Sequence, residues 1–514
     1  MAPASLAAFP DEILRNIVKH FCDHCGTPKS YLGSPLANST AFNGHRDSHD
    51  PAANPPSSAV PDGSSSQGIR CLYSLSLVSR KIRSIAQPIL FHEFSLGCGD
   101  TWEQASRRNW TERLTAYMNT IAIRQDLALW VKKVYIHPLL LENTNRDEAL
   151  AAFRRCGQVL GIRIPQAWTP STWTLGPNQR PTDISLEFLQ MQLLTMLLFL
   201  LPNMEQLTLP TTHEIIFYRM PGLALLTGPG HTNTSVRMLD LAPVPRVRMN
   251  ASISHHMSTE ALGILDLCRD IQTLSLDDCV LGEWNIPKNP LRNLRVLRIM
   301  HGRATEEQLV LLLDALGCTH LEHFAYEAGF PRPDRDPEHF QPPSLVGYLR
   351  KRCKSKLTSF HLDFRRLGPA AKQGAAGMMP PMRDFSALKH LFISSQEVYR
   401  DADAHTLETT VNDNHMLFSL LPDRLETLEF AGDSSIAAPR LAAGLRALSE
   451  RMTSGRFPRL TRIRGDDKQN LDAYGFGDRF ARLGRTFEYA YRSFSEETAW
   501  GGAWGGASRR EDAR

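Results

Sequence analysis

Apolar residues recur at helical spacing in two stretches near the start of the chain. The first, residues 9–21, reads FPDEILRNIVKHF, and the second, residues 72–94, reads LYSLSLVSRKIRSIAQPILFHEF. In the first, Ile13, Leu14, Ile17, Val18 and Phe21 form one apolar stripe at helical spacing. In the second, the apolar positions step by three or four, so an amphipathic helix is predicted in each. Pro10, Asp11 and Glu12 suit the first turn of a helix. Pro88 is expected to end the second helix at about residue 87 and to start a short third one.

A polar segment separates these two stretches. Residues 26–70 are rich in Gly, Ser, Pro and Asn and contain few apolar residues. A segment of this composition buries too little apolar surface to offset the entropy lost on ordering. It is therefore predicted to be a disordered insert.

A second pattern recurs after residue 202: an apolar residue, two variable residues, an apolar residue, one variable residue and another apolar residue. Clear copies start at Met204, Val236, Ile271, Leu294, Leu321, Leu357, Leu388 and Leu425, with an incomplete copy at Leu460 and a candidate early copy at Val131. The spacing between clear copies runs from 23 to 37 residues. The last two apolar positions lie two apart, so they share one side of a strand and are expected to face the core.

Helical stretches are predicted between these strands, at 259–268, 305–316, 343–353 and 441–452. A short strand followed by a helix, repeated along the chain, is typical of a leucine-rich-repeat solenoid. A doubly wound α/β sheet needs the same alternation and stays open as the alternative. The segment contains no glycine-rich phosphate-binding motif, which makes the doubly wound sheet the less favoured of the two.

The two N-terminal stretches, taken together, resemble the F-box of fungal F-box proteins, which often carry degenerate leucine-rich repeats. In that family the first helix starts at a Leu-Pro pair, where this chain has Phe9 and Pro10, and the module is normally continuous. The resemblance implies a helical hook that docks on the Skp-type adaptor of Skp–cullin–F-box ubiquitin ligases. The residues that match the docking positions are Phe9, Pro10, Ile13, Leu14, Ile17, Leu75, Leu77, Val78, Ile82 and Leu90. The alternative is that both stretches are core helices of an all-α cap.

The expected fold is therefore α/β, with a small N-terminal helical module and an irregular repeat solenoid. Four segments are expected. They are an F-box-like module at 1–96 with its insert at about 26–70, a helical and loop transition at 97–202, the solenoid at 203–495, and a disordered tail at 496–514.

Charge and cysteine content narrow the choice of partners and compartment. The net charge of +4 over 514 residues gives no argument for nucleic acid or a membrane as a partner. The nine scattered cysteines favour reduced thiols in an intracellular protein, and the cytoplasm or nucleus is expected.

The longest apolar run, residues 191–201, is shorter than the roughly 20 residues of a membrane span and predicts a buried helix. The basic run at 350–356 is interpreted first as helix-capping charge and second as a nuclear import signal.

Cys22 and Cys25, followed by His45 and His49, have a formal two-Cys, two-His zinc spacing. The 19 residues between the two pairs exceed the usual gap of about 12. The arrangement is interpreted as a chance pair, so no metal and no cofactor are expected.

In the repeats, the residue between the two core positions is expected to point away from the core and to line a target-binding face. The candidates are Arg298, His361, Phe392 and Glu429.

The sequence contains no recognisable motif for a catalytic nucleophile, a general base or a phosphate-binding loop, so no catalytic residue is expected. The predicted function is a substrate-recognition subunit that binds a Skp-type adaptor, and through it a cullin scaffold, together with an unidentified target protein. The alternatives are a non-degradative interaction scaffold and, less favoured, an α/β enzyme.

Overall fold

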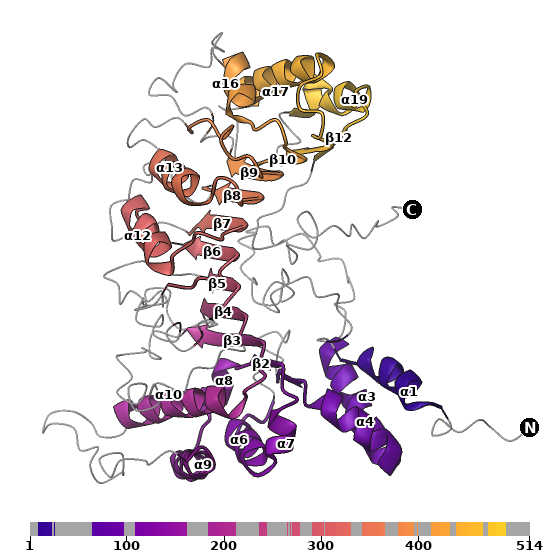
Figure 1. Cartoon of the computed structure of the whole chain (residues 1–514), viewed down its shortest axis with the longest axis vertical. Coiled ribbons are helices and arrows are strands. Elements are labelled where there is room, and N and C mark those ends of the chain that lie inside the picture. Colours follow the sequence, from indigo (N-terminus) through magenta and orange to yellow (C-terminus); the bar gives the residue numbers. More distant parts are fainter. Residues whose placement is uncertain are drawn as a thin grey trace, which may run out of the picture. The chain divides into compact units, whose positions relative to one another are not determined.

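A computed structural model describes the chain in Figure 1. The described residues are 9–22, 25, 64–96, 108–161, 183–211, 236–243, 265, 268, 270–277, 290–302, 304–329, 342–364, 379–394, 398, 413–431, 438–465 and 471–489. Twelve strands are assigned to one sheet, numbered and ordered as they occur along the chain. Every strand pair with a defined register is parallel. The expected α/β class is therefore confirmed.

The chain divides into two compact units. The first spans Met1–His255, Leu267–Arg269 and Thr498–Arg514, and the second spans His256–Asp266 and Asp270–Glu497. The described elements of the first unit are α1 (Asp11–Lys19), α3 (Ser64–Val78), α4 (Arg80–Leu90), β1 (Glu93–Phe94), α6 (Arg113–Ile123), α7 (Gln125–Ala128), β2 (Lys133–Tyr135), α8 (Pro138–Glu142), α9 (Arg146–Val159), α10 (Asp183–Leu200), β3 (Gln206–Thr211) and β4 (Met238–Pro243).

Helices α1, α3 and α4 form a small module at the start of the first unit. One hydrophobic cluster joins them, made of Leu14, Val18, Cys22, Leu72, Ile82, Ile85, Ala86 and Ile89. The cluster draws on both sides of the insert, because Leu14 precedes it and Ile82 follows it. The two stretches therefore share one core. Residues 26–63 of the predicted insert lie outside the described residues.

The helix boundaries in this module differ from the expectation in three ways. Helix α3 begins at Ser64, inside the predicted insert. The second stretch also breaks at Ser79, whose side chain caps α4 by accepting a hydrogen bond from the N–H of Ile82 at 3.2 Å. A serine hydroxyl in that place satisfies a backbone donor that the helix leaves open. Pro88 then lies within α4 and does not end it.

The remainder of the first unit is mostly helical, with α9 packing against α6 and α10. The apolar run at 191–201 lies mainly in α10, and its side chains that the structure describes are mostly buried. The prediction of a buried helix there is confirmed. Within the described ranges, no helix combines the length and apolar character needed to cross a membrane. Within the predicted helical and loop transition, α9 continues to Val159.

The second unit alternates strands and helices. Its described elements are β5 (Thr273–Asp277), β6 (Val296–Gly302), α12 (Glu306–Leu316), β7 (His323–Ala328), α13 (Pro342–Cys353), β8 (Ser359–Asp363), β9 (His390–Ser394), α16 (Asp413–Leu420), β10 (Thr427–Ala431), α17 (Ala438–Thr453), β11 (Arg462–Gly465), a 3-10 helix at Asp472–Tyr474, α19 (Phe476–Ala481) and β12 (Thr486–Tyr489). Figure 1 shows α12 and α13 on the same side of strands β6 to β8.

Each copy of the apolar pattern after residue 202 coincides with one strand, from β3 to β11. The strands pair with matching repeat positions opposite each other. Leu297 of β6 is opposite Phe324 of β7, and Leu391 of β9 is opposite Leu428 of β10. All four side chains are fully buried. The early copy at Val131 also leads into a strand, β2. The sequence did not predict the two end strands, β1 and β12.

Three of the four predicted helices between strands are confirmed as α12, α13 and α17, while most of 259–268 lies outside the described residues. The boundaries of helix α12 are marked in the sequence by its capping residues. Thr305 and Gln308 form a reciprocal capping box at its start. Gly317 ends it with a left-handed backbone (φ of 65°), which costs glycine no steric strain. The predicted tail, 496–514, lies outside the described residues.

Candidate functional site

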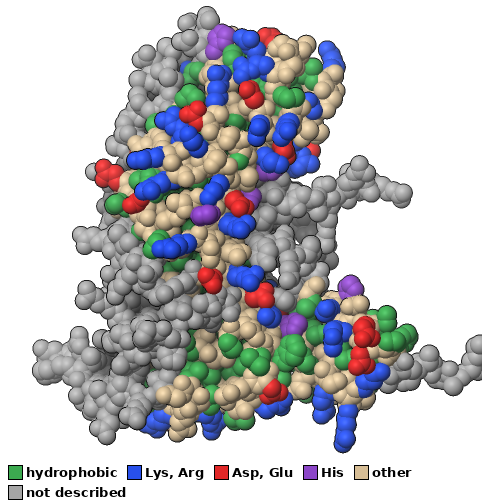
Figure 2. All heavy atoms as spheres, in the orientation of Figure 1, with side chains coloured by type: hydrophobic (Ala, Val, Ile, Leu, Met, Phe, Trp, Pro, Cys, Tyr) green, Lys and Arg blue, Asp and Glu red, His purple; other side chains and the backbone are tan. Residues whose placement is uncertain are grey.

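The helical module carries large apolar side chains that its own core does not cover. Phe9, Ile13 and Ile17 are 41%, 46% and 41% exposed, and Leu77 and Val78 are 58% and 64% exposed. Figure 2 shows hydrophobic side chains on this module among Lys, Arg, Asp and Glu side chains. All five residues are among the predicted adaptor-binding positions.

Helix α1 is apolar on two sides. Leu14 and Val18 face the core and are 1% exposed, while Ile13 and Ile17, each one residue earlier, face outward. Both pairs have the i, i+4 spacing that places residues on one side of a helix. A helix that only completed a core would need the first pair alone. The second pair is therefore a feature that the packing of this module does not explain.

The start of α1 is tied to the start of α4. The ammonium group of Lys81 donates a hydrogen bond to the carbonyl oxygen of Phe9 at 2.8 Å and lies 3.3 Å from the carboxylate of Asp11. Lys81 follows the end of α3 by three residues. Leu77 and Val78 therefore lie toward the same end of the module as Phe9, and Ile13 and Ile17 follow four and eight residues after Phe9 along α1. We call Phe9, Ile13, Ile17, Leu77 and Val78 the apolar docking surface.

The other predicted adaptor-binding residues occupy different positions. Pro10 is exposed beside Phe9. Leu14 and Ile82 are 1% and 2% exposed, so their prediction as contact residues is wrong: they form the core beneath the surface. Leu75 and Leu90 are partly buried against the same core.

Tyr73 of α3 is 58% exposed and is not among the predicted adaptor-binding residues. The sequence indicates that Tyr73 lies on the same side of α3 as Leu77, because the two residues are four positions apart in this helix.

The candidate target-binding residues share one position of the sheet register. Arg298, His361, Phe392 and Glu429 lie in β6, β8, β9 and β10, and cross-strand partners link His361 to Phe392 and Phe392 to Glu429. The rings of His361 and Phe392 stack with centroids 3.8 Å apart. Ala325 of β7 stands between Arg298 and His361 in the same row.

Their expected exposure is wrong. Arg298, His361, Phe392 and Glu429 are 3%, 1%, 6% and 5% exposed. The position between two core residues fixes the side of the strand on which a side chain lies, but it does not decide whether that side meets solvent. Glu429 illustrates the result, because its carboxylate is 3.3 Å from the guanidinium of Arg464 in β11.

Burial also changes the acid–base properties of this region. His323 in β7 has a pKa lowered to about 4 by burial, with the charge of Arg298 and the neighbouring His390 acting in the same direction. Its imidazole is therefore neutral at physiological pH. The pKa of His390 is lowered too, again mainly by burial.

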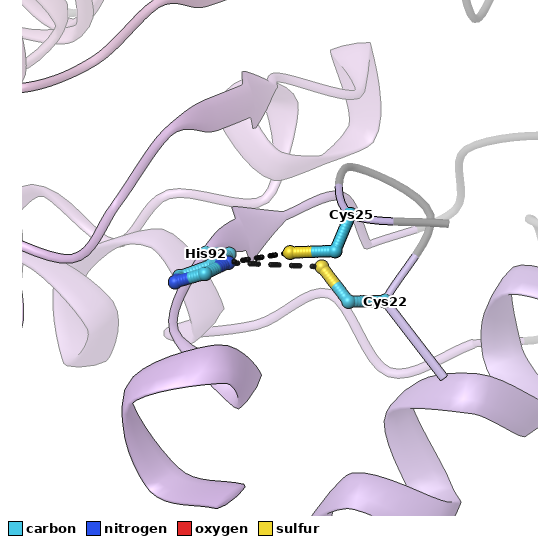
Figure 3. A group of neighbouring side chains, drawn as sticks. All are labelled: Cys22, Cys25 and His92. Atoms are coloured by element: carbon cyan, nitrogen blue, oxygen red, sulfur yellow. Dashed lines mark hydrogen bonds between the residues drawn. The ribbon is translucent and has the colours of Figure 1, made fainter. Parts of the chain in front are cut away.

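A separate group of side chains gathers at the junction of α1, α4 and β1. The thiols of Cys22 and Cys25 and the ring of His92 place one potential metal ligand each within 4.8 Å of one another (Figure 3). His45 and His49, the histidines of the formal zinc spacing, lie outside the described residues. Sequence spacing missed His92 because 67 residues separate it from Cys25. No disulfide joins any of the cysteines that the structure describes.

Comparison with models of known protein families gives no match for this chain, and a search of curated proteins gives none either.

Proposed function

We propose that this protein is the substrate-recognition subunit of a Skp–cullin–F-box type ubiquitin ligase. The observation that carries the proposal is the apolar docking surface, which belongs to a module assembled from the two sequence stretches that resemble an F-box. Its partner would be the Skp-type adaptor, which links F-box proteins to the cullin scaffold.

Physical chemistry favours a protein partner for this surface. Grouped apolar side chains that remain in contact with water are typical of interaction sites, whereas single exposed ones are common everywhere. Each square ångström of apolar area removed from water contributes about 25 cal/mol. A partner that covered Ile13, Ile17 and Leu77 would gain from side chains that are 41–58% exposed in the free protein. The core beneath them is already packed in the free protein.

The finer interpretation of the sheet is an irregular leucine-rich-repeat solenoid. The strand order, which follows the chain from β1 to β12, supports this interpretation. A doubly wound sheet reverses its strand order at a switch point, and this order contains no reversal among the described strands. The strand–helix units β6–α12 and β7–α13, each followed by the next parallel strand, also fit a repeat that completes its core by stacking.

In this proposal the repeats hold a target protein and supply no catalytic residue. The ligase would act by raising the effective concentration of target lysines near the charged conjugating enzyme. Because Arg298, His361, Phe392 and Glu429 are buried, their proposed role is to shape the sheet face and not to contact the target through freely exposed side chains. The proposed compartment is the cytoplasm or the nucleus.

The docking step is tested by adding charge to the apolar docking surface. The double variant Ile17→Asp/Leu77→Asp should retain its fold, because both side chains are exposed at 41% and 58%. It should lose affinity for a purified fungal Skp-type adaptor by at least about tenfold, which corresponds to about 1.4 kcal/mol. Isothermal titration calorimetry measures the change.

The matched control is Ile123→Asp in α6, where an isoleucine is 67% exposed outside the module. It should bind the adaptor as the wild type does. Adaptor binding that is equal in all three proteins, or absent from the wild type, would contradict the proposed function.

A ligase subunit and a non-degradative scaffold differ in what happens to the bound partner. In cells that carry Ile17→Asp/Leu77→Asp, a ligase substrate should accumulate while it still co-purifies with the protein. A scaffold would leave the partner's abundance unchanged. Quantitative mass spectrometry of the co-purified proteins, set against their total cellular abundance, separates the two outcomes.

A further inference from the structure

We propose that Cys22, Cys25 and His92 form a structural zinc site at the junction of α1, α4 and β1. The first two residues follow the end of α1, and the third lies between α4 and β1. Their sulfur and nitrogen atoms converge within 4.8 Å. None of its residues belongs to the apolar docking surface.

The distances fit tetrahedral zinc. Bond lengths of about 2.3 Å for Zn–S and 2.0–2.1 Å for Zn–N place sulfur and nitrogen ligands about 3.5 Å apart when the angle is tetrahedral. The Nδ1 atom of His92 lies 3.3 Å from Sγ of Cys25 and 3.9 Å from Sγ of Cys22. Figure 3 shows both thiols directed toward this one ring nitrogen. Thiolate and imidazole ligands favour zinc over magnesium or calcium, which prefer oxygen ligands.

The backbone holds the two cysteines in place. The N–H of Cys25 donates to the carbonyl oxygen of Cys22 at 3.0 Å, and the N–H of Cys22 donates to Lys19 at 3.1 Å. This turn brings the two thiols of the C-x-x-C pair to the same side. Cys22 is also 3% exposed and belongs to the core of the module. The pair therefore needs little ordering before it binds an ion.

His92 is fixed from the other direction. Its N–H donates to the carbonyl oxygen of Ile89 at 3.1 Å, and its own carbonyl accepts from Lys132 at 2.8 Å and from Lys133 at 2.9 Å. The indole of Trp130 stacks near its ring, with centroids 6.4 Å apart. These contacts hold the imidazole beside the thiols.

Glu93 is the candidate for the fourth ligand. Its carboxylate lies 3.4 Å from Sγ of Cys22, close to the separation of about 3.5 Å expected for sulfur and oxygen ligands of one tetrahedral zinc. Zinc accepts carboxylate oxygen as a ligand alongside sulfur and nitrogen. Three ligands would therefore come from thiols and imidazole, and the fourth from the residue next to His92.

The ion would fasten the two halves of the helical module to each other. It would link Cys25, just before the segment at 26–63, to His92, which is 67 residues later in the chain. Closing a loop of this length removes conformational entropy from the unfolded chain. The binding free energy of a structural metal then adds to the folding free energy.

Metal analysis of the full-length protein tests the site. The protein is purified under reducing conditions with zinc present and then dialysed against metal-free buffer. Elemental analysis should find about one zinc per chain for a single closed site. Cys25→Ser and His92→Asn should lower the zinc content about tenfold or more. The matched control is Cys71→Ser, which removes a partly buried free thiol of α3 in the same module and should leave the zinc content unchanged.

A measurement on the wild type alone does not depend on how well a variant folds. Cobalt(II) added to the metal-free wild type should produce sulfur-to-cobalt charge-transfer absorption and the intense visible bands of a tetrahedral site. Chelation should lower the Tm of the wild type but not that of His92→Asn. Zinc affinity about tenfold weaker in Glu93→Gln would support the fourth ligand, and unchanged affinity would overturn that assignment.

The proposal is overturned if the reduced wild type retains no zinc and gives no tetrahedral cobalt spectrum. Zinc that persists in both Cys25→Ser and His92→Asn would overturn it too. A Cys22–Cys25 disulfide in protein that was never exposed to oxidant, detected by intact mass, would assign the pair to another chemistry.

Discussion

Ile13 and Leu14 are adjacent in the sequence and similar in size, yet one is 46% exposed and the other 1%. The difference arises because the core of the module lies on one side of α1. Both residues were predicted to contact an adaptor, and only Ile13 can do so directly. Among single residues, burial therefore separates those that build the surface from those that support it.

Gly68 lies where the packing of the module leaves no room for a side chain. A Cβ atom at this position of α3 would overlap the carbonyl oxygen of Phe21. Phe21 immediately precedes Cys22, so α3 packs closely on the chain next to the C-x-x-C turn. Gly68→Ala is expected to destabilise the module by about 1–3 kcal/mol, because backbone has to move to relieve the contact.

Thermal unfolding of the full-length protein measures this change. Gly161→Ala would be a poor control, since its φ of 68° strains any side chain; Gly347→Ala is suitable, because nothing lies within 4 Å of its Cβ position. An unchanged Tm in Gly68→Ala would show that α3 does not approach Phe21 closely.

His323 gives a prediction about pH. Its pKa in the folded protein is about 4, whereas the ordinary value is 6.5. Between these values the unfolded chain binds a proton that the folded protein does not, so the free energy of unfolding should fall as the pH falls from 6.5 to 4. One pKa unit corresponds to about 1.4 kcal/mol, so the largest loss is about 3 kcal/mol. Well above pH 6.5 this histidine should contribute no pH dependence, because it is neutral in both states.

Urea unfolding at a series of pH values tests the effect. His323→Gln should flatten the decline between pH 6.5 and 4. His320→Gln, at an exposed position, is the control. A decline of the same size in His323→Gln would assign the pH dependence to other groups.

Among the elements, helix α12 has capping residues at both ends, Thr305 with Gln308 at its start and Gly317 at its end. The hydroxyl of Thr305 accepts from the N–H of Gln308 at 3.2 Å, and the side chain of Gln308 accepts from the N–H of Thr305 at 2.9 Å. Thr305→Ala should lower the stability of the second unit by about 1 kcal/mol, because it leaves a helix donor unsatisfied.

Chemical denaturation measures the loss of stability in Thr305→Ala. Thr305→Ser keeps the oxygen atom and serves as the control, which should retain most of the stability. Equal destabilisation by serine and alanine would show that the methyl group of Thr305, and not its hydroxyl, matters at this position.

The molecule as a whole combines a helical module whose core is self-contained with a sheet whose strands follow the chain in order. Ile82→Ala removes a fully buried side chain from the module, and substitutions of this kind cost about 2–5 kcal/mol. We expect it to abolish adaptor binding while β6 to β10 of the second unit keep their protection from hydrogen exchange. The reason is that the hydrophobic cluster around Ile82 contains only residues of the module.

Hydrogen exchange followed by mass spectrometry reads both regions in one experiment. Leu391→Ala in β9, where the leucine is fully buried, is the reciprocal variant and should affect the second unit and not the module. Loss of protection in both regions of either variant would contradict separate cores.

The sequence by itself determined where the strands of the repeats lie, because each of these strands contains apolar residues at a fixed local spacing. Leu274, Leu297 and Leu391 could be assigned to the core in this way, and each is fully buried. The start of α12 was also readable, since its capping residues are three positions apart.

The tertiary structure alone decided what depends on distant neighbours. Periodicity could not separate Ile13 from Leu14, because that choice depends on where α3 and α4 pack. It could not show that Arg298 and Glu429 are buried, since a strand's pattern fixes its two sides but not what covers them. It could not place His92 beside Cys22 and Cys25 either, because that contact is made only once the chain has folded across the insert.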